Sequence, residues 1–136
     1  MNPKVPLSAV IITKNEEKNI EACLKSVQWA NELIVVDDFS SDKTVEIAKR
    51  FTDKVFQRKM DIEGAHRNWA YRQAKNEWVL SLDADERVTA ELAEEIKEAL
   101  TKETACNGFT IPRRNYIGDY WVRYGGVVSQ PPIKTI

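Results

Sequence analysis

The sequence predicts an α/β protein with a Rossmann-like fold, in which a mostly parallel sheet carries helices on both faces. Short apolar runs rich in β-branched residues alternate along the chain with segments whose apolar residues recur at helical spacing. The links between these segments are short, which is typical of consecutive right-handed βαβ units. A length of 136 residues suits one compact domain, so we assign residues 1–136 to a single domain.

Four strands are expected in the first two thirds of the chain. They cover residues 7–13, 32–36, 54–57 and 78–82. The first, second and fourth are mostly apolar, as in strands that a parallel sheet buries on both faces.

Helices are expected between and after these strands. Asn15 is a candidate cap for the first helix, whose apolar residues recur at i, i+3, i+4 and i+7 from Ile20. Residues 40–44 offer caps for the second helix, and residues 64–74 are predicted to form the third. The apolar spacing within residues 92–100 indicates a fourth.

The pattern changes after Gly108. Residues 109–111 have the composition of a strand, but the aromatic stretch at residues 116–124 is interrupted by glycine. We therefore expect this stretch to form a rim or loop element.

Composition and charge exclude several classes of protein. Twenty Lys and Arg residues against twenty-one Asp and Glu leave a formal net charge of −1, which predicts no nucleic-acid partner. No apolar run reaches the roughly eighteen residues of a membrane span, and residues 1–6 lack the apolar stretch of a signal peptide, so a cytoplasmic location is expected. The spacing of Cys23 and Cys106 favours two reduced thiols, with Cys23 buried on a helix. The single histidine, His66, is expected at the surface or rim.

Polar side chains follow three of the predicted strands at the point where each strand ends. They are Thr13, the pair Asp37 and Asp38, and the pair Asp83 and Asp85. Ligands of open α/β sheets bind outside the carboxyl ends of the strands, where these residues are expected to converge. Four carboxylates at one edge repel one another unless a cation or a hydrogen-bond donor compensates them, and a hard divalent ion does so economically.

The segment Asp83-Ala84-Asp85 is the most specific of these strand ends. Mg²⁺ and Mn²⁺ commonly take one or two protein carboxylates and complete their coordination with phosphate oxygens and water. A diphosphate fits that role, although the same tripeptide is also typical of two solvated turn residues. Arg67 is expected near a helix start, where it either binds an anion or forms an exposed salt bridge.

Three nucleotide-binding or hydrolytic classes are excluded by missing motifs. The sequence has no Gly-x-x-x-x-Gly-Lys-Ser/Thr loop, no Gly-x-Gly-x-x-Gly after the first strand, and no Gly-x-Ser-x-Gly elbow. P-loop NTPases, simple dinucleotide-dependent dehydrogenases and α/β-hydrolases are therefore not expected.

Three motifs taken together resemble the family 2 glycosyltransferases. They are Val-Ile-Ile-Thr-Lys-Asn-Glu-Glu at residues 10–17, Val-Val-Asp-Asp-Phe-Ser-Ser-Asp-Lys-Thr at residues 35–44, and Leu-Asp-Ala-Asp-Glu at residues 82–86. Their order and spacing both match. The segment Ala-His-Arg-Asn-Trp-Ala at residues 65–70 is similar to a branch that includes lipopolysaccharide-core glucosyltransferases.

This resemblance implies a GT-A fold, a nucleotide diphosphate sugar donor that often carries UDP, and inverting transfer assisted by Mg²⁺ or Mn²⁺. The acceptor is expected to be a saccharide or a glycolipid of the lipopolysaccharide type, which the protein would reach at the inner face of the membrane. Site residues follow from position in the motifs. By this resemblance Thr13 and its neighbours Asn15 and Glu17 line the base, and Asp38 and Asp37 hold the uracil or ribose. Arg67 approaches the nucleotide. Asp83 approaches the ribose, the donor sugar or the metal, and Asp85 binds the metal.

The chain departs from the family pattern at two places. Phe39 stands where the turn after the second strand usually has glycine, so that turn cannot rely on free access to positive φ. The resemblance also implies a longer acceptor-binding half, whereas residues 127–136 form an atypical tail, so the chain is expected to be the donor-binding half and to transfer sugar poorly. A non-catalytic module that binds a nucleotide sugar or a metal is the alternative, and a phosphoacceptor signalling domain is a third hypothesis.

Overall fold

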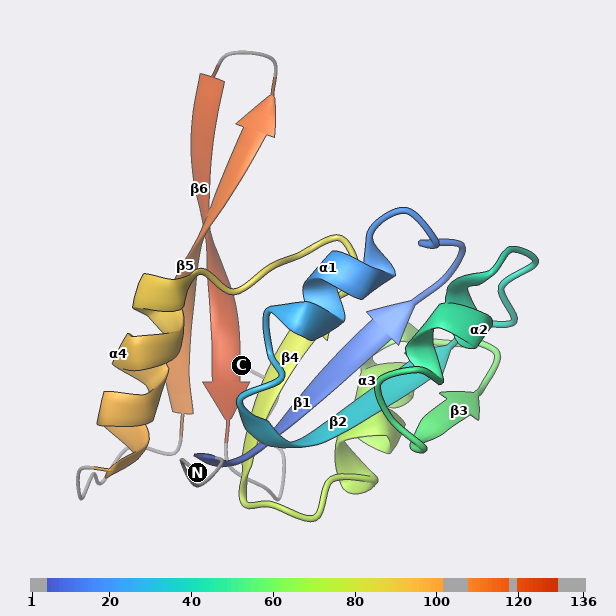
Figure 1. The fold of residues 1–136 in the computed structure, drawn as a ribbon, viewed down its shortest axis with the longest axis horizontal. Helices are drawn as coiled ribbons and strands as arrows, with labels where there is room; N and C mark the ends of the chain where they lie inside the picture. The colour runs from blue at the N-terminus through green and yellow to red at the C-terminus, as the bar shows by residue number, and fades with distance from the viewer. Residues whose placement is uncertain (1–4, 102–107, 118–119, 130–136) are drawn as a thin grey trace.

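The computed structural model describes residues 5–101, 108–117 and 120–129, which form a six-stranded sheet with helices on both faces (Figure 1). The strands are β1 (Val5–Thr13), β2 (Ala30–Asp37), β3 (Val55–Gln57), β4 (Trp78–Asp83), β5 (Gly108–Ile117) and β6 (Tyr120–Ser129). The helices are α1 (Ile20–Lys25), α2 (Thr44–Ala48), α3 (Glu63–Arg72) and α4 (Ala90–Thr101). The strand order is β3-β2-β1-β4-β6-β5, with β1 to β4 parallel and β6 antiparallel to β4 and β5. The predicted α/β fold with a mostly parallel sheet is confirmed.

Two apolar clusters bury the two faces of the sheet. On one face, residues from β1, β2 and β4 pack with α1, α2 and α4, including Leu24, Ala48 and Ile96. On the other face, β2 and β4 pack with Ala70 and Tyr71 of α3. Because both faces are covered, β1 is buried along Leu7–Ile11 and reads as an apolar run in the sequence, interrupted only by Ser8.

The first helix begins later than the sequence predicts. Asn19 occupies the N-cap position of α1, and Asn15 lies four residues earlier in the loop after β1 with a positive φ of 52°. The expectation that Asn15 caps this helix is therefore wrong. An asparagine tolerates the left-handed region, and the Asn15 side chain is occupied by the Ser41 N–H, which donates to its Oδ1.

The aromatic stretch after Gly108 is also different from the prediction. Its described residues, 116–117 and 120–124, belong to β5 and β6, which pair from Gly108↔Ser129 to Ile117↔Tyr120. β6 also pairs with β4, where residues 127–129 lie opposite residues 79–81. Figure 1 shows the far half of this hairpin extending beyond the rest of the sheet. The loop expectation was wrong, and residues 127–129 of the expected tail form part of a strand, whereas residues 130–136 and Cys106 lie outside the described residues.

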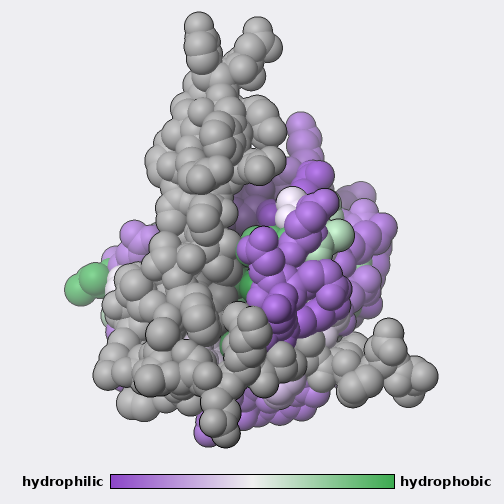
Figure 2. All heavy atoms as spheres, turned by 90° about the vertical axis from the view of Figure 1, so that its left-hand side faces the viewer, coloured by the Kyte–Doolittle hydropathy of each residue, from purple (hydrophilic) through white to green (hydrophobic). Residues whose placement is uncertain are grey.

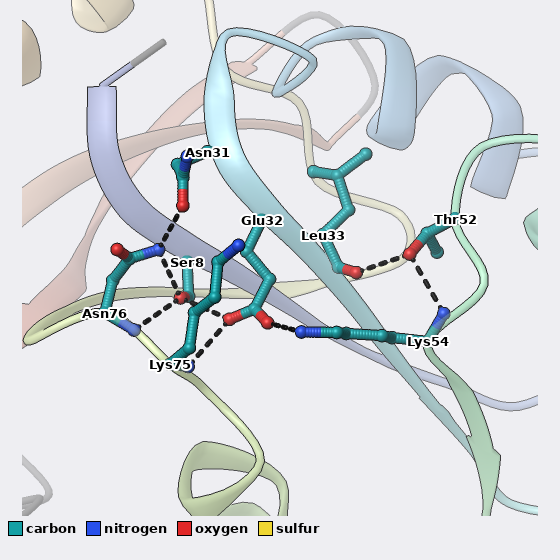
Figure 3. Close-up of polar contacts among 8 residues, drawn as sticks. All are labelled: Ser8, Asn31, Glu32, Leu33, Thr52, Lys54, Lys75 and Asn76. Atoms are coloured by element: carbon teal, nitrogen blue, oxygen red, sulfur yellow. Dashed lines mark hydrogen bonds and ion pairs between the residues drawn. The ribbon is translucent and has the colours of Figure 1, made fainter.

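A buried polar network ties the sheet together at the edge opposite the carboxyl ends of the strands (Figure 3). Its centre is Glu32 of β2, which accepts hydrogen bonds from Ser8 Oγ at 2.7 Å and from the Lys75 backbone N–H at 2.8 Å and forms an ion pair with Lys54. The Asn76 amide donates to Ser8 Oγ at 3.1 Å. The network joins β1 and β2 to the segment before β3 and to the loop between α3 and β4.

The described surface is largely polar. Figure 2 shows mostly hydrophilic side chains over the described part of one face. Large exposed apolar side chains among the described residues are Phe39, Met60 and Ile62. None of the helices in the described ranges is long and apolar enough to cross a membrane.

Candidate functional site

A cleft of about 270 Å³ lies at the carboxyl ends of β1, β2 and β4. Thr13 ends β1, Asp38 follows β2, and Asp83 ends β4, so the three strand ends meet at one place as the sequence predicts. Helix α3 supplies a further wall. The lining residues are Ile12, Thr13, Lys14, Glu16, Asp38, Met60, Glu63, His66, Arg67, Asp83, Ala84 and Asp85.

The loops after β1 and β2 are fastened to each other by hydrogen bonds. The Asn15 N–H donates to Ser40 Oγ at 2.7 Å, and the Ser41 N–H donates to Asn15 Oδ1 at 2.8 Å. The Glu17 N–H donates to Asp42 Oδ2 at 3.2 Å, and the Glu17 carboxylate accepts from the Lys43 N–H at 3.4 Å. Asn15 and Glu17 are therefore in the loops that shape the site, but neither lines the cleft.

Asp37 and Asp38 have different surroundings. The Asp37 carboxylate is fully buried and accepts from the Ser40 N–H at 2.8 Å, from Ser40 Oγ, and from the Gln57 amide at 3.4 Å. Asp37 does not line the cleft. Asp38 does, and its carboxylate accepts from the Met60 N–H at 3.2 Å and lies 3.7 Å from Lys14 Nζ. Of the two, Asp38 is the carboxylate that a ligand in the cleft can reach.

Arg67 lies in the second turn of α3 and not at its start, because α3 begins at Glu63. Its guanidinium donates to Asp83 Oδ1 at 2.8 Å and to Glu63 Oε1 at 3.2 Å. Burial acts to lower the pKa of Arg67, but the hydrogen bond and charge of Asp83, with smaller contributions from Tyr71 and Glu63, together outweigh burial and raise the pKa above its ordinary value. Arg67 forms the ion pairs of the second alternative, with a side chain that is 22% exposed, and because it also lines the cleft its binding of an anion stays a prediction.

The carboxylates of Asp83 and Asp85 both line the cleft, and Asp85 is exposed. Among the described residues, no three His, Cys, Asp or Glu side chains form a group that could hold a metal by themselves. This donor set still fits Mg²⁺ or Mn²⁺, because such ions often use one or two protein carboxylates and take their other oxygens from phosphate and water. It does not fit a structural metal centre closed by protein ligands.

His66 is a residue of the cleft that the sequence does not predict. It is fully buried, so the expectation of a surface or rim position was wrong. Its Nδ1 lies 3.0 Å from Arg58 Nη1. Burial and the nearby Arg58 guanidinium lower its pKa, which keeps the imidazole neutral at pH 7. Trp69 and Ala70 follow His66 at i+3 and i+4, and this spacing is the signal that it faces inward.

The predicted burial of Cys23 is confirmed. Burial and the carboxylates of Glu86, Asp85 and Asp83 raise the pKa of its thiol to about 12. The thiol therefore stays protonated at neutral pH and is not a nucleophile of the neighbouring cleft.

Residues 8–135 match the model of the family described as "Glycosyl transferase family 2". A relative in Rhizobium meliloti (strain 1021), lipopolysaccharide core biosynthesis glycosyltransferase LpsC, is 31% identical over 125 residues, which are 88% of this chain and 46% of LpsC. An uncharacterized glycosyltransferase of Rickettsia bellii (strain RML369-C) is 44% identical over 92 residues, covering 67% of this chain and 31% of that protein.

Solved structures show the same fold. A crystal structure of TarS from S. aureus aligns with a TM-score of 0.57 and 28% identity, covering 70% of this chain and 32% of that one. A second TarS crystal structure, in complex with UDP, aligns with the same TM-score and 27% identity. The chain spans less than half the length of these relatives. The predicted GT-A fold is confirmed, and the match over residues 8–135 shows that the chain belongs to glycosyl transferase family 2.

Proposed function

We propose that this chain forms the donor-binding part of a glycosyltransferase and holds a nucleotide diphosphate sugar, with UDP as the nucleotide, in the cleft. The observation that carries the proposal is the meeting of Thr13, Asp38, Arg67 and Asp83 around one cleft at the carboxyl ends of three strands. The TarS structure that contains UDP supports the choice of nucleotide. The name of LpsC supports a saccharide or glycolipid acceptor of the lipopolysaccharide type.

Several polar side chains in and near the cleft have roles that we assign from their chemistry. We assign the base or ribose to Thr13 and Asp38, because both line the cleft, the Thr13 hydroxyl can donate and accept, and the Asp38 carboxylate accepts from N–H and hydroxyl groups. Arg67 supplies positive charge toward the nucleotide, and Asp83 fixes the guanidinium by a 2.8 Å hydrogen bond. Asn15, Glu17 and Asp37 do not line the cleft, and their role is to hold the loops after β1 and β2 in position.

Asp85, with Asp83 beside it, would hold Mg²⁺ or Mn²⁺. When bound, such an ion would supply positive charge that neutralises the diphosphate leaving group. Arg67 adds a second positive group that does not depend on the metal. Inverting transfer, low turnover by the 136-residue chain and a cytoplasmic location remain predictions from the sequence.

Thermal unfolding with nucleotide and metal tests the proposal. UDP with Mn²⁺ or Mg²⁺ is expected to stabilise the chain, whereas UDP in EDTA does so only weakly, because Asp38, Asp83 and Asp85 disfavour an uncompensated diphosphate. At a ligand concentration about a hundred times the dissociation constant the gain is about 2.7 kcal/mol. That gain corresponds to a rise in melting temperature of roughly 4 °C or more. Equal stabilisation in EDTA would remove the metal from the proposal, and no response to any nucleotide diphosphate would refute nucleotide binding.

A further inference from the structure

Two polar atoms in the wall of the cleft are buried and have no hydrogen-bond partner among the described residues. They are Thr13 Oγ1 and His66 Nε2. The two residues come from different elements, the end of β1 and the middle of α3. A buried polar atom without a partner is costly, so two of them on one cleft indicate where a polar ligand completes the hydrogen bonding.

The proton of His66 is placed by Arg58. A guanidinium has donors only, so the 3.0 Å contact between Arg58 Nη1 and His66 Nδ1 requires Nδ1 to accept. The neutral imidazole then carries its proton on Nε2. Arg58 is itself held in place, because it pairs with Asp61 at 3.3 Å and lies over the Trp69 ring at 5.8 Å from its centroid. The unpartnered atom on the cleft is therefore a fixed N–H donor.

A neutral donor is suited to a neutral acceptor. Phosphate oxygens gain most from charged donors, and Arg67 provides such a donor on the same cleft. Asp38, whose charge acts on His66, is an acceptor for an N–H group of a base. Uracil presents a carbonyl next to an N–H, so the donor His66 and the acceptor Asp38 match the two kinds of group on its edge.

We infer that His66 is a specificity-determining residue of the donor site, whose Nε2–H donates a hydrogen bond to a carbonyl oxygen of the nucleotide base. The inference rests on the proposed binding of a nucleotide diphosphate in this cleft. Since His66 is fully buried, the base must displace the side chains over Nε2 as it binds. Met60 lines the same cleft, is 44% exposed, and has the most adaptable of the apolar side chains.

Calorimetric titration of UDP and its sulfur-substituted forms, 2-thio-UDP and 4-thio-UDP, in Mg²⁺ tests this contact. Sulfur is a weaker acceptor than oxygen, so one of the two substitutions is expected to weaken binding to the unaltered chain by about 2- to 10-fold. His66→Leu is expected to weaken UDP binding by the same factor and to remove the effect of the sulfur. His66→Gln, whose amide can donate from a similar position, is expected to retain part of both. Arg72→Leu, on the exposed face of the same helix, is the control and leaves all three affinities unchanged.

The single histidine also permits a direct measurement. Nitrogen-15 NMR of the imidazole is expected to show protonated Nε2 and unprotonated Nδ1, and saturation with UDP is expected to shift Nε2 more than Nδ1. This measurement needs no variant, so it decides the question even where His66→Leu fails to fold.

Failure of the inference is distinguishable from failure of the proposed function. If the unaltered chain binds no nucleotide diphosphate, the proposed function fails and the inference fails with it. If the chain binds UDP but His66→Leu binds it equally well, or the effect of the sulfur persists in His66→Leu, the inference alone is overturned. A proton on Nδ1 would overturn it as well.

Discussion

Replacing Glu32 by glutamine tests whether the polar network at the far edge of the sheet stabilises the fold. The Glu32 side chain is only 3% exposed, and its two oxygens face donors from Ser8, Lys54 and the Lys75 backbone. Glutamine has the same shape but keeps only one acceptor oxygen. Its NH₂ group must therefore face either the Lys54 ammonium or the Lys75 N–H, which are both donors. Figure 3 shows these donors converging on the carboxylate.

The magnitude follows from the burial of the two partners. Breaking a buried ion pair by removing one partner costs about 3–5 kcal/mol. Lys54 is 43% exposed and can regain water, which places the expected loss near the lower end, at about 3 kcal/mol. That is a large fraction of the roughly 5–15 kcal/mol by which a domain is stable. Urea unfolding at pH 7 measures the loss.

Glu21→Gln is the matched control. Glu21 pairs with Lys25 at 3.5 Å on the surface of α1, and both side chains are more than half exposed. An exposed pair at this spacing contributes roughly 0.3–0.5 kcal/mol. A loss below about 1 kcal/mol in Glu32→Gln, or a loss equal to that of the control, would refute the reasoning.

The effect of Glu32→Gln also depends on pH. Burial acts to raise the pKa of Glu32, but the hydrogen bonds from Lys54, Lys75 and Ser8 outweigh it, so the folded pKa lies below the ordinary value of 4.5. A lowered folded pKa means that the stabilisation is fully present above about pH 4.5 and is lost as the pH falls through the folded pKa. The stability difference between the unaltered chain and Glu32→Gln should therefore shrink in acid. A difference that stays constant below pH 4.5 would contradict the assignment of the charge to this network.

Three further substitutions test the cleft and its loops. Asp85→Ala is expected to abolish the metal-dependent rise in melting temperature with UDP and to leave the stability of the ligand-free chain nearly unchanged. Asp53, which is also exposed, provides the control, and Asp53→Ala should keep that rise. Arg67→Ala is expected to weaken UDP binding by about 1–3 kcal/mol in calorimetry, whereas Arg72→Ala on the same helix should not. If Arg67→Ala binds UDP as tightly as the unaltered chain, Arg67 only forms a structural ion pair. Phe39→Gly should raise the unfolding free energy by up to about 1 kcal/mol, because relief of a φ of 47° is partly offset by the entropy of glycine. A clear loss of stability in Phe39→Gly would show that the aromatic side chain makes stabilising contacts.

The parallel strands could be predicted from the sequence because strands that are buried on both faces consist mostly of apolar residues. β1, β2 and β4 appear as apolar runs whose ends are polar. Since ligand sites of such sheets form at those ends, Thr13, Asp38 and Asp83 could be brought together without a structure. The same argument cannot place a residue on a neighbouring helix, which is why His66 was missed.

The hairpin of β5 and β6 could not be predicted for a different reason. Pro112 and the glycines at 125 and 126 are typical of loops, but Pro112 and Gly125 are register partners within the hairpin. β5 is the edge strand of the sheet, and an edge strand can accommodate proline because one row of its N–H groups needs no partner. The pairing of β6 with β4 thus outweighs the loop preference of the proline and the glycines. The sequence shows these local preferences but not the pairing.

The pair Asp37 and Asp38 shows that a sequence motif does not predict which of two adjacent acids faces the site. Both are carboxylates at the end of one strand, and the sequence assigns both to the nucleotide. Successive side chains of a strand point to opposite sides, so two adjacent acids cannot share one environment. Asp37 uses its carboxylate on Ser40 and Gln57, which closes the turn in which Phe39 adopts a positive φ. Asp38 is then left facing the cleft, so one acid shapes the turn that presents the other to the cleft.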